Sequence, residues 1–344
     1  MTTRSPSPPG LDLGRLAAWA EDNLPRLRSG RLEATLIVGG KSNLTYRLAA
    51  GGKACVLRRP PLGHVLSTAH DMSREYRVMY ALQSTTVPVP QMLAHCEDPA
   101  VIGAPFYLMS YVEGTPYRRA RELAGLGQER VRAISARMVD TLVALHDVDY
   151  RAVGLEDFGR PDGFVGRQVR RWKRQIDSSH SRDLPDAEKL FTALLRRLPE
   201  DREARIVHGD LRLDNLLIDA SDQPAAVIDW EMATLGDPLT DLALMVVYQR
   251  IGELAGSEAV ADASSAPGFL SEDEVLDRYA ITSGRDLADL GFYLALASFK
   301  LAAILEGIHY RYLRGETVGP GFDAVGALPE QLLASGLTSL KETA

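Results

Sequence analysis

The sequence predicts an α+β protein with a small β-rich N-terminal part and a larger, mainly helical C-terminal part. Its 344 residues exceed what one hydrophobic core usually organises, so two compact parts are expected. Strand-like runs separated by Gly-Gly turns dominate residues 34–61, whereas helical periodicity dominates the chain after residue 114. We therefore divide the chain into a disordered, Ser- and Pro-rich N-terminus at 1–10, an N-terminal part at 11–113 and a C-terminal part at 114–344.

The N-terminal part begins with apolar residues at helical spacing between positions 11 and 24, which predicts a short helix. Residues 34–61 carry β-rich runs around two Gly-Gly turns, so we expect a series of antiparallel hairpins. A helical pattern follows at 68–82, and an apolar strand is expected at 105–113. That strand ends at Gly114, where Gly-Thr-Pro breaks regular structure.

The C-terminal part contains several helical patterns and one strand-rich island. Helices are expected at 129–146, 164–198, 272–282 and 287–313. The island at 206–230 therefore interrupts an otherwise helical part of the chain.

Composition and charge exclude several classes of protein. A formal net charge of −7 argues against a dedicated nucleic-acid-binding protein. The N-terminus lacks the apolar core of a secretory signal, and no apolar run approaches the roughly 20 residues that span a bilayer. Cys55 and Cys96 form no CxxC pair, so neither a zinc site nor a disulfide framework is indicated. We expect a soluble, cytoplasmic protein with no nucleic-acid or membrane partner.

The most informative segment is the strand-rich island. His208-Gly209-Asp210 follows a short apolar run, Asn215 lies five positions later, and a second apolar run ends at Asp229. Two strands joined by a short polar loop would bring the two carboxylates and the amide to one edge. Such oxygen ligands suit Mg²⁺, which takes its remaining ligands from water and phosphates. This pattern predicts phosphoryl transfer, in which a carboxylate receives the proton of the attacking hydroxyl.

Other motifs fit less well. The residues GGKS at 39–42 suggest a Walker A loop, but that motif requires a glycine where Thr35 stands and a helix after the lysine. The LTYRL that follows has the pattern of a strand. Neither GxSxG nor HExxH occurs, which argues against the corresponding serine hydrolases and zinc proteases.

Three segments resemble motifs of the aminoglycoside phosphotransferase and choline kinase-like family: HGDLRLDN at 208–215, IDWE at 228–231 and GDPLTDLA at 236–243. The first is similar to the HRDxxxxN catalytic loop of kinases and the second to their DFG motif. The resemblance implies a bilobal protein-kinase-like fold, with a β-rich N-lobe and a helical C-lobe. It also implies ATP or GTP as phosphoryl donor, Mg²⁺ as cofactor and a small-molecule hydroxyl group as acceptor.

The same resemblance assigns roles to residues of these motifs. Asp210 is the catalytic base that orients the substrate hydroxyl, and Asn215 and Asp229 bind Mg²⁺. Asp241 is the buried aspartate that hydrogen-bonds the backbone of the catalytic loop. His208 is expected to brace that loop rather than to exchange protons.

The N-terminal part resembles the nucleotide-binding half of this family. The segment GGKSNLTYRL at 39–48 is similar to its nucleotide loop, and Gly39, Gly40, Ser42 and Asn43 would then lie against phosphates. The segment lacks GxGxxG, and Gly-Gly is common in hairpins, so an ordinary hairpin is the alternative.

Arg58 stands where kinases carry the lysine of the third strand, and Glu75 would be its partner on the following helix. Arginine binds phosphate bidentately and is always charged, but it is not equivalent to lysine. The alternative is an exposed arginine on an edge strand beside an exposed helical glutamate.

The segment FYLMSYVEG at 106–114 resembles the interlobe hinge of the family. The carbonyl of Ser110 and the amide of Val112 would face adenine, with Met109 behind it. Because these contacts use backbone atoms, an ordinary buried strand is the alternative.

The motifs do not name the acceptor. Three segments resemble the kinase domains that are fused to acyl-CoA dehydrogenases, namely residues 39–48, 56–79 and the basic run RQVRRWKRQ at 167–175. That branch has been linked to hydroxyacyl-CoA phosphorylation, which implies an anionic or CoA-linked acceptor. The basic run would meet its negative charges, or it is an ordinary solvated helix face.

Two other functions stay open. An aminoglycoside- or choline-type kinase would hold a cationic acceptor with acidic residues of the helical part. A pseudokinase would bind nucleotide as a scaffold without transfer, and only the arginine at position 58 favours it, because Asp210, Asn215 and Asp229 are all present. We expect a monomer or a homodimer.

Overall fold

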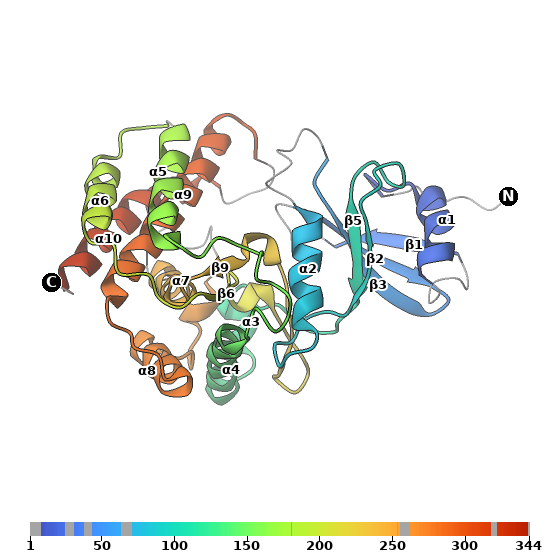
Figure 1. The fold of residues 1–344 in the computed structure, drawn as a ribbon, viewed down its shortest axis with the longest axis horizontal. Helices are drawn as coiled ribbons and strands as arrows, with labels where there is room; N and C mark the ends of the chain where they lie inside the picture. The colour runs from blue at the N-terminus through green and yellow to red at the C-terminus, as the bar shows by residue number, and fades with distance from the viewer. Residues whose placement is uncertain are drawn as a thin grey trace. The chain divides into compact units, whose positions relative to one another are not determined.

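A computed structural model shows the predicted α+β architecture, a five-stranded antiparallel sheet followed by a mostly helical part (Figure 1). It describes residues 8–24, 31–37, 43–62, 71–179, 181–252, 254, 262–317 and 322–342. Three predicted phosphate-loop residues, Gly39, Gly40 and Ser42, lie outside the described residues, as do the first seven residues of the N-terminus.

The chain forms two compact units. The first comprises Met1–Glu113 with Ile228–Glu231, and the second comprises Gly114–Val227 with Met232–Ala344. The sequence-based division placed residues 228–231 in the C-terminal part, and this was wrong. These residues pack with the first unit because Asp229 pairs with Arg58 of the sheet.

The first unit is built on the sheet, whose strand order is β1-β2-β3-β5-β4. Its strands are β1 (Glu33–Leu36), β2 (Leu44–Ala50), β3 (Lys53–Arg59), β4 (Met92–Cys96) and β5 (Phe106–Ser110), and its helices are α1 (Leu13–Asn23) and α2 (Met72–Leu82). The β1-β2 and β2-β3 pairs are antiparallel, which confirms the predicted hairpins. Strand β4 was not predicted.

Strand alternation sorts the side chains of β3 and β5 onto two faces. Leu57 of β3 and Phe106 of β5 belong to the apolar core that α1 covers through Leu16. Arg58 and Tyr107 pair in register between the strands and point to the other face, where both contact Glu75 of α2. The polar cluster around Arg58 is therefore a consequence of the pleat.

The second unit is mainly helical. Its helices are α3 (Ala120–Ala124), α4 (Gln128–Asp147), α5 (Phe164–Ser178), α6 (Pro185–Arg196), α7 (Leu239–Gly252), α8 (Glu272–Ser283), α9 (Leu290–Leu313) and α10 (Leu328–Glu342). The prediction of helix throughout 164–198 was wrong between α5 and α6. Leu184 lies outside the helical region there, and Pro185 begins the second helix, a position that suits its fixed φ.

Helix α9 is the core of the second unit and packs against α5, α6, α7 and α10 (Figure 1). It is the only described helix long and apolar enough to cross a membrane, and 78% of its most apolar window is buried inside the protein. This is the pattern of a central helix around which others pack.

Two small antiparallel ribbons carry the polar motifs. Strand β6 (Arg205–Val207) pairs with β9 (Thr234–Gly236), and β7 (Leu216–Ile218) pairs with β8 (Pro224–Val227). The prediction of one pair of strands flanking the loop was therefore wrong. The 208–215 loop connects the two ribbons instead, and it ends in one 3₁₀ turn at Leu213–Asn215.

Candidate active site

Asp241 fixes the backbone of the 208–215 loop. Its carboxylate, in the first turn of α7 and only 2% exposed, accepts hydrogen bonds from the amides of His208 (2.6 Å) and Gly209 (2.7 Å). Burial alone would raise the pKa of Asp241, but the hydrogen bonds that it accepts from His146 and from the His208 amide bring it below its ordinary value. An ionised carboxylate thus holds the loop, as the resemblance implied.

Two histidines complete this support. His208 Nδ1 accepts a hydrogen bond from the amide of Asp210 at 3.2 Å. Burial lowers the pKa of His146, so this imidazole stays neutral and has one N–H. Its Nε2 lies 3.4 Å from the Asp241 carboxylate and its Nδ1 lies 2.8 Å from the hydroxyl of Tyr279. The proton is therefore placed on Nε2, which donates to Asp241, while Nδ1 accepts from the phenol.

Gly209 has φ +82°, a conformation that side chains other than glycine rarely adopt. A Cβ at this position would lie 2.9 Å from both the Cβ and the carbonyl oxygen of Met232. The tight turn before Asp210 is therefore available only to glycine.

Replacing Gly209 by Ala is expected to destabilise the protein by about 2–5 kcal/mol, the sum of left-handed strain and overpacking. Urea unfolding measures this change. Gly284→Ala is a matched control, because Gly284 has φ +66° but a Cβ added there would meet no atom within 4 Å. If both variants lose the same stability, the contact with Met232 contributes nothing.

The carboxylate of Asp210 has a defined orientation. Its Oδ1 accepts a hydrogen bond from the hydroxyl of Tyr248 at 2.7 Å, and its Oδ2 accepts one from Asn215 Nδ2 at 3.0 Å. Asn215 Nδ2 also donates to the Asp210 carbonyl at 2.8 Å, which leaves the amide oxygen of Asn215 free to bind a cation. With its side chain 25% exposed, Asp210 is held in place but remains accessible.

Tyr248 was not predicted from the sequence. Burial, followed by the negative charge of Asp210, raises its pKa well above the ordinary value, so the phenol is a neutral donor. It follows Asp241 by seven residues on α7, two helical turns along one face. That spacing is a signal which could have identified it.

Replacing Tyr248 by Phe is expected to lower kcat about 10-fold, because one hydrogen bond to an ionised group no longer fixes the Asp210 carboxylate. The KM for the nucleotide should not change. Steady-state kinetics test this expectation, with the exposed Tyr312→Phe as control. A normal kcat in Tyr248→Phe would show that the phenol does not position Asp210.

Arg212 and Asp214 form a second pair beside Asp210. Their closest side-chain atoms are 2.9 Å apart, and Arg212 Nε lies 3.5 Å from Asp210 Oδ2. The Arg212 guanidinium also lies 4.8 Å from the ring centre of Tyr248. Burial raises the pKa of Asp214, which Arg212 opposes. Both residues stand within the HGDLRLDN motif, but the motif alone does not indicate their contacts.

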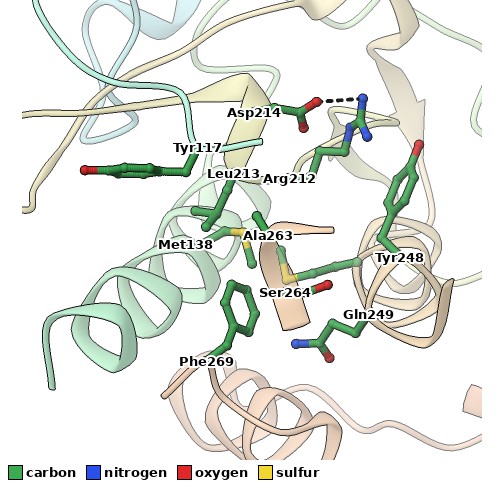
Figure 2. A pocket seen from close by; sticks show the side chains of 11 residues that line it. Tyr117, Met138, Arg212, Leu213, Asp214, Tyr248, Gln249, Ala263, Ser264 and Phe269 are labelled. Atoms are coloured by element: carbon green, nitrogen blue, oxygen red, sulfur yellow. Dashed lines mark ion pairs between the residues drawn. The ribbon is translucent and has the colours of Figure 1, made fainter. Parts of the chain in front are cut away.

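Arg212, Asp214 and Tyr248 line a pocket in the second unit (Figure 2). The lining residues are Tyr117, Met138, Arg212, Leu213, Asp214, Met245, Tyr248, Gln249, Ala263, Ser264 and Phe269. Most of the wall is apolar, and the polar side chains that contact Asp210 stand at one end (Figure 2). The pocket therefore begins beside the carboxylate that was predicted to act as base.

The first unit contains the other predicted residues. Arg58 Nε lies 3.0 Å from Glu75 Oε2, and Arg58 Nη2 pairs with Asp229. The hydroxyl of Tyr107 donates to Glu75 at 2.9 Å. Arg58 is 8% exposed on the central strand of the sheet and Glu75 is 1% exposed, which excludes an exposed pair on an edge strand.

The charged residues of this cluster shift one another's pKa values. Burial would lower the pKa of Arg58, but the negative charges of Glu75, Asp229 and Glu231 raise it, so the guanidinium stays charged. Burial raises the pKa of Glu75, and the charge of Arg58 opposes that rise.

Asn43 joins the cluster from the predicted phosphate loop. Its Nδ2 donates to Glu75 Oε1 at 3.0 Å and to Glu231 Oε2 at 3.2 Å. Asp229 has φ +67°, a left-handed conformation that is uncommon for a residue with a side chain. The Arg58 pair holds this strained residue in place, with its side chain 29% exposed.

The predicted metal ligands carry donor atoms that fit Mg²⁺. Asn215 offers an amide oxygen and Asp229 a partly exposed carboxylate, and hard oxygen ligands are those that Mg²⁺ prefers. Among the described residues, no group of three or more His, Cys, Asp or Glu side chains could hold a metal. Magnesium commonly binds through one or two protein ligands together with phosphates and water, so a larger cluster is not required.

The predicted hinge residues follow β5. Met109 is 8% exposed and pairs with Val56 of β3, and the Ser110 amide donates to the Gln91 carbonyl at 2.8 Å. Within the described part of the chain, the amide of Val112 has no hydrogen-bond acceptor. It is thus available to a ligand, as the predicted adenine contact requires.

Known proteins resemble this chain in sequence. The profile of the phosphotransferase enzyme family matches residues 33–279. Acyl-CoA dehydrogenase family member 11 of Gallus gallus is 35% identical over 320 residues, which cover 91% of this chain and 41% of that protein. The chain thus spans less than half the length of this curated relative. The predicted resemblance to kinase domains of acyl-CoA dehydrogenase fusions is confirmed.

Solved structures give the same result. A Ralstonia eutropha protein whose name assigns it to the aminoglycoside phosphotransferases is 33% identical, with a TM-score of 0.83, and 96% of this chain and 98% of that chain are covered. A mutant of the aminoglycoside phosphotransferase APH(4)-Ia, solved in complex with AMP-PNP and hygromycin B, shares the fold. Its TM-score is 0.61 at 15% identity, and 96% of this chain and 98% of that chain are covered. The chain therefore belongs to the phosphotransferase enzyme family, the family of the aminoglycoside phosphotransferases.

Proposed function

We propose that this protein transfers the γ-phosphoryl group of ATP, or of GTP, to a hydroxyl group of a small molecule, with Asp210 as the catalytic base. The main support is the orientation of the Asp210 carboxylate, which accepts hydrogen bonds from Tyr248 and Asn215. Asp241 holds the loop that carries it, and a quarter of the Asp210 side chain stays exposed. Phosphoryl transfer depends mainly on such positioning.

Asp210 is assigned two tasks, to orient the acceptor hydroxyl and to accept its proton. Its carboxylate accepts a hydrogen bond from the acceptor hydroxyl, orients the oxygen for attack and takes the proton as the bond to phosphorus forms. The Tyr248 phenol keeps the carboxylate in one orientation during this step. The apolar pocket wall next to it would exclude water, which would otherwise compete as acceptor.

The nucleotide is assigned to residues of the first unit. The Val112 amide and Ser110 carbonyl would bind adenine beside Met109, and Arg58, held by Glu75, would face the phosphates. Asn215 and Asp229 would hold Mg²⁺, which neutralises charge on the phosphate oxygens when it is bound. The Arg58–Glu75 pair favours an active enzyme over a pseudokinase, because arginine here makes the contact expected of lysine.

For the acceptor, we propose an anionic or CoA-linked metabolite such as a hydroxyacyl-CoA. The support is the similarity to acyl-CoA dehydrogenase family members and the basic residues of α5. The alternative, an aminoglycoside- or choline-type acceptor, is supported by the shared fold alone.

A panel of hydroxylated compounds tests the function. ADP release with ATP and Mg²⁺ is measured for aminoglycosides, choline, ethanolamine, sugars and hydroxyacyl-CoA thioesters. We expect acceptor-dependent release with hydroxyacyl-CoA thioesters by the wild type and none by Asp210→Asn. Absence of release across the panel, together with no ATP-induced rise in melting temperature, would contradict the kinase function. Release with choline or aminoglycosides alone would show that the acceptor is cationic and would contradict the proposed anionic class.

A further inference from the structure

Lys300 of α9 contacts the catalytic loop from a second direction. Its Nζ donates to the Gly209 carbonyl at 2.5 Å, one residue before Asp210. No motif of the sequence includes it, and its side chain is only partly exposed. Among the described residues, no carboxylate forms an ion pair with this ammonium group.

Arg171 of α5 is a second cation that contacts the same tryptophan as Lys300. Its guanidinium lies 5.0 Å from the ring centre of Trp172, and the Lys300 ammonium lies 5.6 Å from the centre of the same ring. Trp172 is 5% exposed, and its buried indole ring contacts two cations from different helices. Arg171, too, has no carboxylate partner within the described ranges.

Two other basic residues of α5 already have partners. Lys173 pairs with Asp177 at 2.6 Å and Glu188 at 3.2 Å, and Arg167 donates to the carbonyls of Asp162 and Arg160. The predicted basic run is therefore not one uniform charged surface. Only some of its members remain available to a ligand, and Arg171 is the one whose guanidinium lies over the same indole ring as the Lys300 ammonium.

The two cations affect each other. Burial lowers the pKa of Lys300, the charges of Asp210 and Asp241 oppose this, and the positive charge of Arg171 lowers it further. Arg171 is exposed and Lys300 partly exposed, and two like charges without an acidic partner repel each other. An anionic group that joined them would relieve this repulsion.

We propose that Arg171 and Lys300, which both contact the Trp172 ring, bind an anionic group of the acceptor, a carboxylate or a phosphate, so that the same molecule presents its hydroxyl to Asp210. This inference rests on the proposed phosphotransfer function and narrows it. The acceptor then carries a negative charge that reaches Arg171 and Lys300 while its hydroxyl reaches Asp210, and a polycationic acceptor is disfavoured by the same two residues.

The kinetic test compares matched acceptors, a hydroxy acid with its neutral amide and a hydroxylated phosphate monoester with its neutral dimethyl triester. Arg171→Gln and Lys300→Met should each raise KM for the charged acceptors about 10- to 100-fold, as expected for loss of a charge-assisted hydrogen bond. KM for ATP and for the neutral acceptors should not change. Lys300→Arg should restore most of the affinity, and Lys173→Met on the same helix as Arg171 should behave as the wild type.

A binding test needs no turnover. Trp172 fluorescence is followed while inorganic phosphate or acetate is added to the wild-type protein, and the two titrations separate phosphate from carboxylate selectivity. A saturable change that Arg171→Gln weakens at least about 10-fold, and that Trp172→Phe removes, supports the site. A change unaffected by Arg171→Gln, or a larger KM for ATP instead of the acceptor, overturns it.

Failure of the two proposals can be told apart. If the wild type releases ADP with an acceptor but Arg171→Gln leaves KM unchanged for charged and neutral compounds alike, the anion site is refuted and the transferase stands. If anions bind at Trp172 but no acceptor supports ADP release and ATP gives no thermal shift, the anion site stands and the transferase is refuted.

Discussion

Asp210→Asn is expected to lower kcat for acceptor phosphorylation by about 10³-fold, since general-base catalysis contributes roughly 10²- to 10⁴-fold. The asparagine is nearly isosteric and can still accept a hydrogen bond from Tyr248, but it cannot take the proton of the attacking hydroxyl. Steady-state ADP release at saturating ATP and acceptor measures the change.

The control for this variant is structural. Asp210→Asn should keep the circular dichroism spectrum of the wild type and its ATP-induced thermal shift, because the substitution conserves side-chain volume and the carboxylate is not buried. Asp273→Asn, a change of the same chemistry on α8, should retain full activity. A kcat for Asp210→Asn close to that of the wild type would assign the base to another group.

Arg58→Ala is expected to lower both the stability of the protein and its phosphoryl transfer. Arg58→Ala leaves Glu75 buried at 1% exposure without its cation, which is expected to destabilise the first unit by about 3–5 kcal/mol. It also removes the partner of Asp229, a predicted magnesium ligand. We therefore expect a lower urea midpoint together with almost complete loss of phosphoryl transfer.

A double-mutant cycle measures how much of the lost stability comes from the Arg58–Glu75 pair. Glu75→Ala should destabilise less than Arg58→Ala, because Arg58 retains Asp229, and the double variant should recover part of the lost stability. Arg58→Lys should restore stability partly and test whether lysine can replace arginine here. Additive stability losses for the two alanine variants would show that the pair is not coupled.

Much of the first unit could be predicted, because local patterns determine it. Alternation along β3 places Arg58 and Leu57 on opposite faces, and a helix after the strand offers Glu75 at one position. The β2-β3 hairpin follows from Gly51 and Gly52, which both have positive φ. The motif spacing likewise identified Asp210 and Asn215, which the structure brings together.

The residues that were missed come from distant segments. Tyr248 of α7 contacts Asp210, which lies 38 residues earlier in the sequence. Lys300 of α9 contacts Gly209, which lies 91 residues earlier. Periodicity predicted α9, at 287–313, but no helix was predicted over α7, and a helical pattern does not say which polar side chain faces the loop. The pairing of β6 with β9 was missed for the same reason, since it joins segments on either side of the β7-β8 ribbon.

The most direct test is to identify the product. The protein is incubated with ATP, Mg²⁺ and the best acceptor of the panel, and phosphorus NMR follows the γ-phosphoryl group in the wild type and in Asp210→Asn. We expect a new phosphate monoester resonance on the acceptor with the wild type and none with the variant. Formation of inorganic phosphate alone, or an equal yield of monoester from both proteins, would contradict Asp210-dependent transfer to a hydroxyl group.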